Sequence, residues 1–206
     1  MGQTDWKADN ERTIKHFSEL VDRHEFHCNS VDWRSKKSQE LRFEILNAVG
    51  PLDEKKILDV GCGLADFYKY LNHLNLAVHY TGCDITPSMI RYARQRLPHI
   101  ELEVRDLAQE ENLSPEFDYV FASGIFYLRQ KESIIYLEQM ARQMFSLCRH
   151  GVAFNSLSIY APDREAHEFY ADPSEVLKVC LNITPWVTIR HDYLPHDFTV
   201  YLYRRD

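Results

Sequence analysis

Residues 58–66 read Leu-Asp-Val-Gly-Cys-Gly-Leu-Ala-Asp and lie between a short apolar run and the start of an expected helix. Glycines at positions 61 and 63 let the backbone approach a ligand where any Cβ would collide. The N–H groups at the start of the following helix point at the same spot, where they can meet a carboxylate or a phosphate. This loop therefore predicts a site for a nucleotide-type cofactor, with a purely structural strand-to-helix turn as the alternative.

Two carboxylates narrow the choice of cofactor. Asp84 lies at the end of the next expected strand, where an acid can accept both hydroxyls of a ribose. The alternative for Asp84 is a helix-capping acid, although the hydroxyl of Thr86 is expected to fill that role. Position 66 is Asp, so the third glycine of the dinucleotide fingerprint is missing. A carboxylate there would repel a pyrophosphate and attract the ammonium of a methionine moiety, which favours S-adenosylmethionine over NAD.

From residue 56 the pattern strand, turn, helix repeats along the chain. The expected strands span residues 57–60, 78–84, 100–104, 117–122, 152–157, 186–190 and 198–203. The expected helices between them span about 65–74, 86–97, 132–148 and 173–181. Residues 191–197, between the last two strands, are too few for a crossover helix, so the last strand must be antiparallel. The pattern predicts an α/β fold with a doubly wound, mostly parallel sheet.

The first 50 residues read differently, as two helices over about 6–25 and 35–49, closed by Gly50 and Pro51. We therefore expect an N-terminal helical cap over residues 1–50 and a cofactor-binding domain over residues 51–206.

Four segments in this order resemble the class I S-adenosylmethionine-dependent methyltransferases. Residues 58–66 look like the first motif of that family, and Asp84 within 81–85 resembles its ribose-binding acid. Asp106 within 105–107 is similar to the acid that meets the adenine amino group, with a surface loop acid as the alternative. Residues 117–124 look like the fourth-strand motif that borders the methyl-transfer site.

The resemblance implies a seven-stranded sheet of order 3-2-1-4-5-7-6 with the last strand antiparallel. It also implies S-adenosyl-L-methionine as methyl donor, with S-adenosyl-L-homocysteine as product. The residues that we expect to line the donor site are Asp59, Gly61, Gly63, Asp66, Asp84, Ile85, Asp106, Leu107 and Ser123.

The acceptor site is expected at the carboxyl ends of the strands, where the segment 191–197 also lies. His191 and His196 have carboxylates nearby, which can orient a neutral imidazole as a general base. The alternatives are a solvated hairpin and a metal site. The cluster His24, His27 and Cys28 lacks a second cluster at matching spacing, so we expect no metal there.

Other residues are candidates for the donor carboxylate or the acceptor. Arg42 is either such a contact or a solvated helix charge. Trp33 and Gln39 are candidates for the same contacts. The wall of a pocket for a flat or hydrophobic acceptor is a candidate role for Phe126, Tyr127, Tyr160, Phe169 and Tyr170, with ordinary core or lid packing as the alternative.

The composition limits the class of protein. The chain has 206 residues and a net charge of −7, which argues against a large phosphate-binding surface, so nucleic acid is an unlikely partner. Its five cysteines are scattered, and neither an apolar run long enough to span a membrane nor a secretory signal is present, which predicts a cytoplasmic protein. We expect methylation of oxygen or nitrogen on a small molecule, by a monomer or a homodimer. The alternatives are a protein or RNA methyltransferase, an aminopropyl transferase of the same fold, and a non-catalytic binding module.

Overall fold

A single sheet of seven strands organises the molecule, in the order β3-β2-β1-β4-β5-β7-β6. The computed structural model describes residues 6–24 and 36–205. The strands are β1 Lys56–Val60, β2 His79–Asp84, β3 Glu101–Val104, β4 Phe117–Ala122, β5 Cys148–Leu157, β6 Val187–Leu194 and β7 Asp197–Tyr203. Strands β1 to β5 run parallel, and β7 pairs antiparallel with both β5 and β6. The predicted order and the antiparallel last strand are confirmed.

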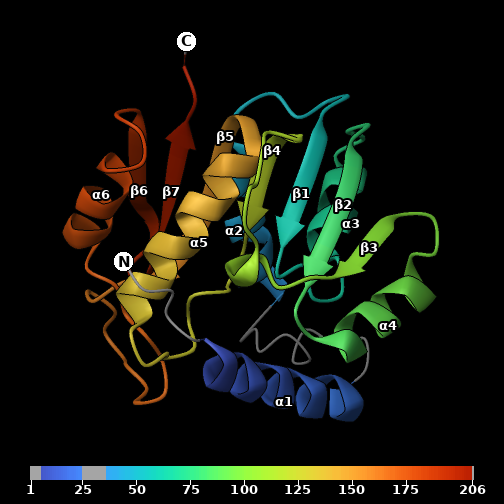
Figure 1. Cartoon of the computed structure of the whole chain (residues 1–206), viewed down its shortest axis with the longest axis horizontal. Coiled ribbons are helices and arrows are strands. Elements are labelled where there is room, and N and C mark those ends of the chain that lie inside the picture. Colours follow the sequence, from blue (N-terminus) through green and yellow to red (C-terminus); the bar gives the residue numbers. More distant parts are fainter. Residues whose placement is uncertain (1–5, 25–35, 206) are drawn as a thin grey trace.

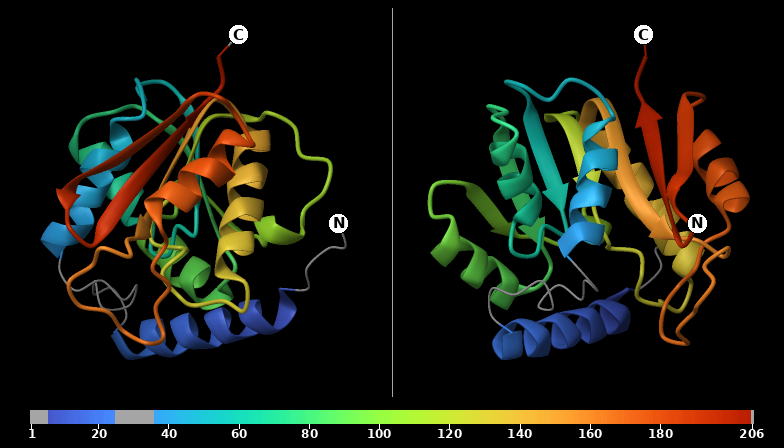
Figure 2. Two further views of the ribbon diagram at one scale, coloured as in Figure 1. Left: turned by 90° about the vertical axis from the view of Figure 1, so that its left-hand side faces the viewer. Right: turned by 180° about the vertical axis from the view of Figure 1, so that it is seen from behind.

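Helices cover both faces of this sheet (Figures 1 and 2). They are α1 Lys7–His24, α2 Lys36–Asn47, α3 Asp66–His73, α4 Pro87–Arg96, α5 Ser133–Leu147 and α6 Pro173–Leu181, with the short 3-10 helix η2 Leu107–Gln109 after β3. On one face α5 and α6 pack over β4, β5 and β7, and on the other α2, α3 and α4 pack over β1 and β2. Central strands buried on both faces explain the continuous apolar runs in the sequence.

The N-terminal segment does not form a separate core. Phe43 and Leu46 of α2 are buried in the same cluster as Phe67 of α3 and Phe121 of β4. Helix α1 lies across the end of the sheet at which β1 and β2 finish, and it packs against α4 (Figure 1). The expected boundary at residue 50 stays a prediction.

Two expected boundaries near the carboxyl end of the chain were wrong. Strand β5 begins at Cys148, directly after α5, because the backbone at Cys148 already pairs with Phe117 of β4. Strand β6 continues to Leu194 through a register shift after Arg190, so the turn to β7 contains only residues 195 and 196. Because β6 is a half-exposed edge strand, its apolar alternation is weak and the extension could not be read from it.

Candidate active site

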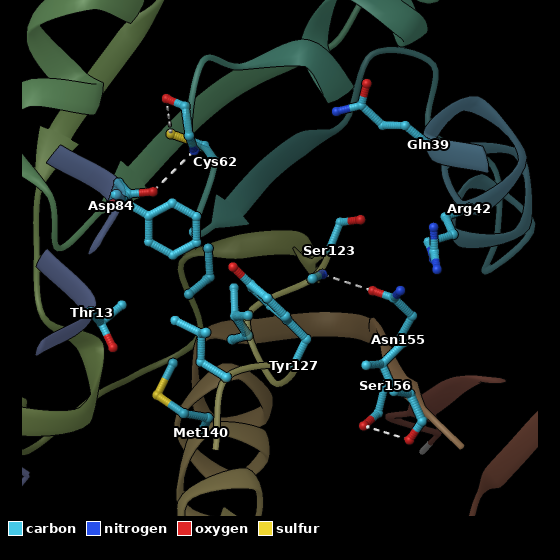
Figure 3. Close-up of a pocket in the computed structure, with 18 of the residues that line it drawn as sticks. Thr13, Gln39, Arg42, Cys62, Asp84, Ser123, Tyr127, Met140, Asn155 and Ser156 are labelled. Carbon is cyan, nitrogen blue, oxygen red and sulfur yellow. Dashed lines mark hydrogen bonds between the residues drawn. The ribbon is translucent and has the colours of Figure 1, made fainter. Parts of the chain in front are cut away.

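A cavity of about 230 Å³ lies where β1, β2, β4 and β5 end. By this measure one water needs only about 10–15 Å³, so the cavity has room for a sizeable ligand. All nine residues expected at the donor site line it, namely Asp59, Gly61, Gly63, Asp66, Asp84, Ile85, Asp106, Leu107 and Ser123. Figure 3 shows Asp84 and Arg42 on opposite sides of this space, with Ser123 and Tyr127 between them.

The glycine loop takes a backbone conformation that a side chain would strain. Gly61 and Gly63 have φ values of 69° and 52°, in the left-handed region. A Cβ on Gly61 would also collide with Cγ2 of Ile125. The amides of Gly61 and Cys62 donate to the carbonyl of Cys83 at 2.8 and 3.0 Å, which ties the loop to the end of β2.

Asp84 is held in place by backbone donors. Its Oδ2 accepts from the amide of Gly63 at 3.0 Å and its Oδ1 from the amide of Thr86 at 2.8 Å. Burial raises the pKa of this carboxyl, and the two backbone bonds oppose that rise. The expected capping role of the Thr86 hydroxyl was wrong, since it makes no capping bond. The carboxylate of Asp84 holds the amide of Thr86, the residue before α4, and lines the cavity at the same time.

The loop after β3 presents Asp106 and Leu107 to the cavity. Asp106 Oδ2 accepts from Asn10 Nδ2 of α1 at 2.6 Å, and its Oδ1 accepts from the amide of Ala108 at 3.2 Å. Burial raises the pKa of Asp106, while these two bonds lower it. Asp106 is therefore anchored rather than a free surface acid.

Asp59 and Asp66 have partners within the protein. The hydroxyl of Tyr80 donates to Asp59 at 2.6 Å, and burial raises the pKa of Asp59 to about 7. The carboxylate of Asp66 forms an ion pair with Arg96 of α4 and lies 3.8 Å from Lys69. Asp66 lines the cavity as expected, but its charge is matched by Arg96, so this geometry does not favour it as the group that meets an ammonium.

The turn after β4 separates the two ends of the cavity. Gly124 has a φ of 77°, and its amide donates to Oδ1 of Asn155 at 2.9 Å (Figure 3). The hydroxyl of Ser123 is buried and has no hydrogen-bond partner among the described residues. A buried polar atom without a partner costs free energy, so Ser123 is suited to bond a ligand in the cavity.

A buried polar network forms the wall opposite Asp84. Arg42 Nε donates to Asp197 Oδ2 at 2.6 Å, and both side chains are buried. Asp197 also accepts from Tyr193 at 2.5 Å and from Asn155 at 3.2 Å. Arg42 donates through Nη1 to the hydroxyl of Ser38 at 2.7 Å. Of the two alternatives for Arg42, the solvated helix charge is excluded, because the residue is only 5% exposed.

The two histidines proposed as a base are separated. His196 lines the cavity, beside Asp197 in the turn before β7. His191 does not line it, because β6 extends past its position and leaves it exposed, with its ring centroid 5.9 Å from that of Tyr160 and the two rings tilted by 41°. Its expected place in the turn was therefore wrong.

The other candidates also divide between cavity and core. Gln39, Tyr127 and Tyr170 line the cavity, whereas Phe126 and Phe169 pack in or against the core. Tyr160 is 63% exposed. Trp33, His27 and Cys28 lie outside the described residues, as does the side chain of His24.

Sequence reasoning missed several residues that the structure brings to the cavity. Thr13 and Phe17 of α1 cover it, and Asn155 and Ser156 of β5 line its wall. The signal for the last two was the pair of polar residues closing an otherwise apolar strand, at the end of the sheet where ligands bind. No such signal marks the α1 residues.

Residues 6–24 and 36–205 hold neither a metal-binding cluster nor a membrane-spanning helix. No three His, Cys, Asp or Glu side chains gather there as a metal site would require. None of the helices in these ranges is both long and apolar enough to cross a membrane.

Known proteins resemble this chain in sequence and in fold. Residues 57–151 match the model of a methyltransferase domain. The chain is 31% identical to "Putative methyltransferase Rv1506c" of Mycobacterium tuberculosis, over 76% of this chain and 95% of the relative.

Solved structures repeat the arrangement at lower identity. Phosphoethanolamine N-methyltransferase 1 of Haemonchus contortus, in complex with phosphoethanolamine and S-adenosylhomocysteine, has a TM-score of 0.70 at 12% identity, covering 97% of this chain and 50% of that one. The magnesium protoporphyrin IX methyltransferase of Synechocystis PCC 6803, with bound S-adenosylmethionine, has a TM-score of 0.58 at 14% identity. This match covers 100% of this chain and 86% of that one. With the strand order, the glycine loop and the close relative in agreement, the chain belongs to the class I S-adenosylmethionine-dependent methyltransferases.

Proposed function

We propose that the protein transfers the methyl group of S-adenosylmethionine to a nitrogen or oxygen atom of a small molecule. One observation carries the proposal. A single cavity joins the glycine loop and Asp84 at one end to the network around Arg42 and Asp197 at the other. Donor and acceptor would thus meet in one continuous space near Ser123, which is what an in-line transfer needs.

The residues at the first end fit the donor. Asp84 offers a fixed carboxylate to the ribose hydroxyls, and Asp106 offers one to the adenine edge. The loop at Gly61 leaves backbone exposed beside the start of α3, where the methionine end would lie. When bound, the donor supplies a methyl group already activated on a sulfonium, so the protein has mainly to align the reactants and exclude water.

The cover over the cavity favours a small acceptor over a polymer. Thr13 and Phe17 of α1 lie on one side. On the other side the chain between β5 and α6 docks on the turn after β4. There the amide of Phe169 donates to the carbonyl of Tyr127 at 2.7 Å. The amide of Arg129 donates to the carbonyl of His167 at 3.0 Å. A peptide or RNA strand would have to displace these segments.

The charges at the acceptor end favour nitrogen over oxygen. Asp163 and Glu168 line this end, and Glu168 accepts a hydrogen bond from Tyr170. The charge of Arg42 is matched by Asp197, so the carboxylates leave an excess of negative charge that suits an amine. During transfer the nitrogen forms a bond to the methyl carbon, the carbon–sulfur bond breaks with its electrons on sulfur, and one proton leaves the nitrogen. We propose His196 as the group that accepts this proton.

Calorimetric titration with S-adenosylmethionine, S-adenosylhomocysteine and NAD tests the donor. We expect the two sulfur compounds to bind and NAD not to bind. Asp84→Asn should weaken binding by roughly 10–100-fold, since a hydrogen bond to a charged group contributes about 1.5–3 kcal/mol. Asp192→Asn, which removes a carboxylate on the exposed edge strand β6, should leave binding unchanged. Equal effects of both variants, or binding of NAD alone, would contradict the proposal.

A second titration tests the acceptor on the complex with S-adenosylhomocysteine. Benzylamine, benzyl alcohol and benzoate have similar size and differ in charge. We expect benzylamine to bind most tightly and to lose affinity in Glu168→Gln. A preference for benzoate would contradict an amine acceptor without affecting the assignment of the donor.

A further inference from the structure

Helix α1 reaches the acid that we assign to adenine. We infer that Asn10 of α1 orients the carboxylate of Asp106, and that discrimination between 6-amino and 6-oxo purines therefore depends on α1. The inference rests on the proposed function, because it assumes that S-adenosylmethionine occupies the cavity. Asn10 is a positioning residue in this account, since it acts on the donor through Asp106.

The contact is a short, partly buried hydrogen bond to a carboxylate. Asn10 Nδ2 lies 2.6 Å from Asp106 Oδ2, and Asn10 is 7% exposed. The other carboxylate oxygen, Oδ1, accepts from the amide of Ala108 at 3.2 Å. With one donor on each oxygen, the plane of the carboxylate is fixed. Each oxygen retains a lone-pair direction for one further donor.

Asn10 is itself held through Trp6, the residue before α1, whose carbonyl accepts from the amide of Asn10 at 2.8 Å. Trp6 is 1% exposed and meets the ring of Tyr136 edge to face at 5.1 Å. Its Nε1 donates to Oε1 of Gln139 at 2.9 Å, and Nε2 of Gln139 donates to the carbonyl of Ala108 at 2.6 Å. One side chain of α5 thus contacts both the residue that leads into α1 and the loop that carries Asp106. The three elements fix the position of Asn10 relative to Asp106.

The chemistry of the contact determines what it can select. An ionised carboxylate only accepts hydrogen bonds, so it pairs with an exocyclic amino group and repels a carbonyl oxygen at the same place. The bond from Asn10 lowers the pKa of Asp106, against the effect of burial, and so favours the ionised form. Without Asn10 the carboxylate can rotate and take up a proton, and both changes reduce its preference for an amino group. Since Asn10 lies on α1, the same contact makes base selection depend on that helix being docked.

The test compares S-adenosylhomocysteine with S-inosylhomocysteine, which carries a 6-oxo group instead of the 6-amino group. The measured quantity is the ratio of their dissociation constants, obtained by calorimetry on the full chain. We expect the wild type to prefer the adenosyl compound by at least about tenfold, as for one lost hydrogen bond to a charged group. Asn10→Ala and the near-isosteric Asn10→Leu should each reduce this ratio about fivefold or more.

Ser18→Ala is the matched control. Ser18 anchors the far end of α1 through its hydroxyl, 3.0 Å from that of Ser88, and does not line the cavity. We expect it to leave the ratio unchanged. If Asn10→Leu weakens both ligands equally, Asn10 only supports the helix and the inference is overturned. If the wild type binds neither ligand, the proposed function fails as well, so the two failures are distinguishable.

Discussion

Arg42 and Asp197 form an ion pair between residues that lie far apart in the sequence, one on α2 and the other at the start of β7. Their charged atoms lie 2.6 Å apart, and the side chains are 6% and 1% exposed. Asn155 joins this pair to the turn after β4, because its amide group contacts both Asp197 and Gly124. The pair therefore connects α2 and β7 with the place where we expect methyl transfer.

Breaking this pair should destabilise the protein strongly. Asp197→Asn leaves the buried charge of Arg42 without a counter-charge, which typically costs about 3–5 kcal/mol. The matched control is Glu138→Gln, which breaks an exposed helical pair with Arg142 and should cost at most about 1 kcal/mol. The free energy of unfolding in urea measures both. Equal costs would mean that the Arg42–Asp197 pair is solvated.

Asp59 should make stability depend on pH. Its pKa is raised to about 7 by burial, so the folded protein keeps a proton that the unfolded chain, with a pKa near 3.8, releases. Stability is therefore fully present below pH 4, falls as pH rises towards 7, and changes little from this group above that. Asp59→Asn removes the effect. Between pH 5 and pH 8 the wild type should lose about 2–3 kcal/mol more than the variant.

The control for this experiment is Asp192→Asn, which removes an exposed carboxylate on β6. Its pH profile should follow that of the wild type. Parallel profiles for the wild type and Asp59→Asn would show that Asp59 is ionised in the folded protein over this range.

Elements with a strong signal in their own residues were predicted correctly. The bounds of β4 and α6 agree with the expected residues, because each has a clear apolar pattern and distinct flanking signals. Asp84 was assigned to the cavity from the order of strand and helix alone. The order of the sheet followed from the family resemblance and from the short connection between the last two strands.

Long-range partners were the part that could not be predicted. Whether Arg42 is solvated or buried depends on Asp197, 155 residues away. The pairing of Asp66 with Arg96 likewise depends on how α3 and α4 pack. At the start of α4 neither candidate cap bonds to the first turn of the helix, and the carboxylate of Asp84 accepts from the amide of Thr86 instead.

Gly61 should tolerate no side chain. Its φ of 69° costs an alanine about 1–3 kcal/mol, and the added Cβ would collide with Ile125. Gly61→Ala should therefore lower the free energy of unfolding and abolish binding of S-adenosylhomocysteine. The control is Ala65→Gly in the same loop, where Ala65 already has a φ of 57°, so glycine relieves strain and should change stability by less than about 1 kcal/mol. Unimpaired binding in Gly61→Ala would exclude the loop from the donor site.

Ser123 should separate ligand binding from stability. Its buried hydroxyl has no partner among the residues that the structure describes, so Ser123→Ala removes no bond from the ligand-free protein. We expect the free energy of unfolding to stay within about 0.5 kcal/mol of wild type, or to rise. Binding of S-adenosylmethionine or of the acceptor should weaken by about tenfold, because a hydrogen bond is lost only in the complex. Ser146→Ala, which removes an exposed hydroxyl on α5, should change neither quantity. A loss of stability without a loss of binding would place the Ser123 hydroxyl in the support of the turn after β4 rather than in contact with a ligand.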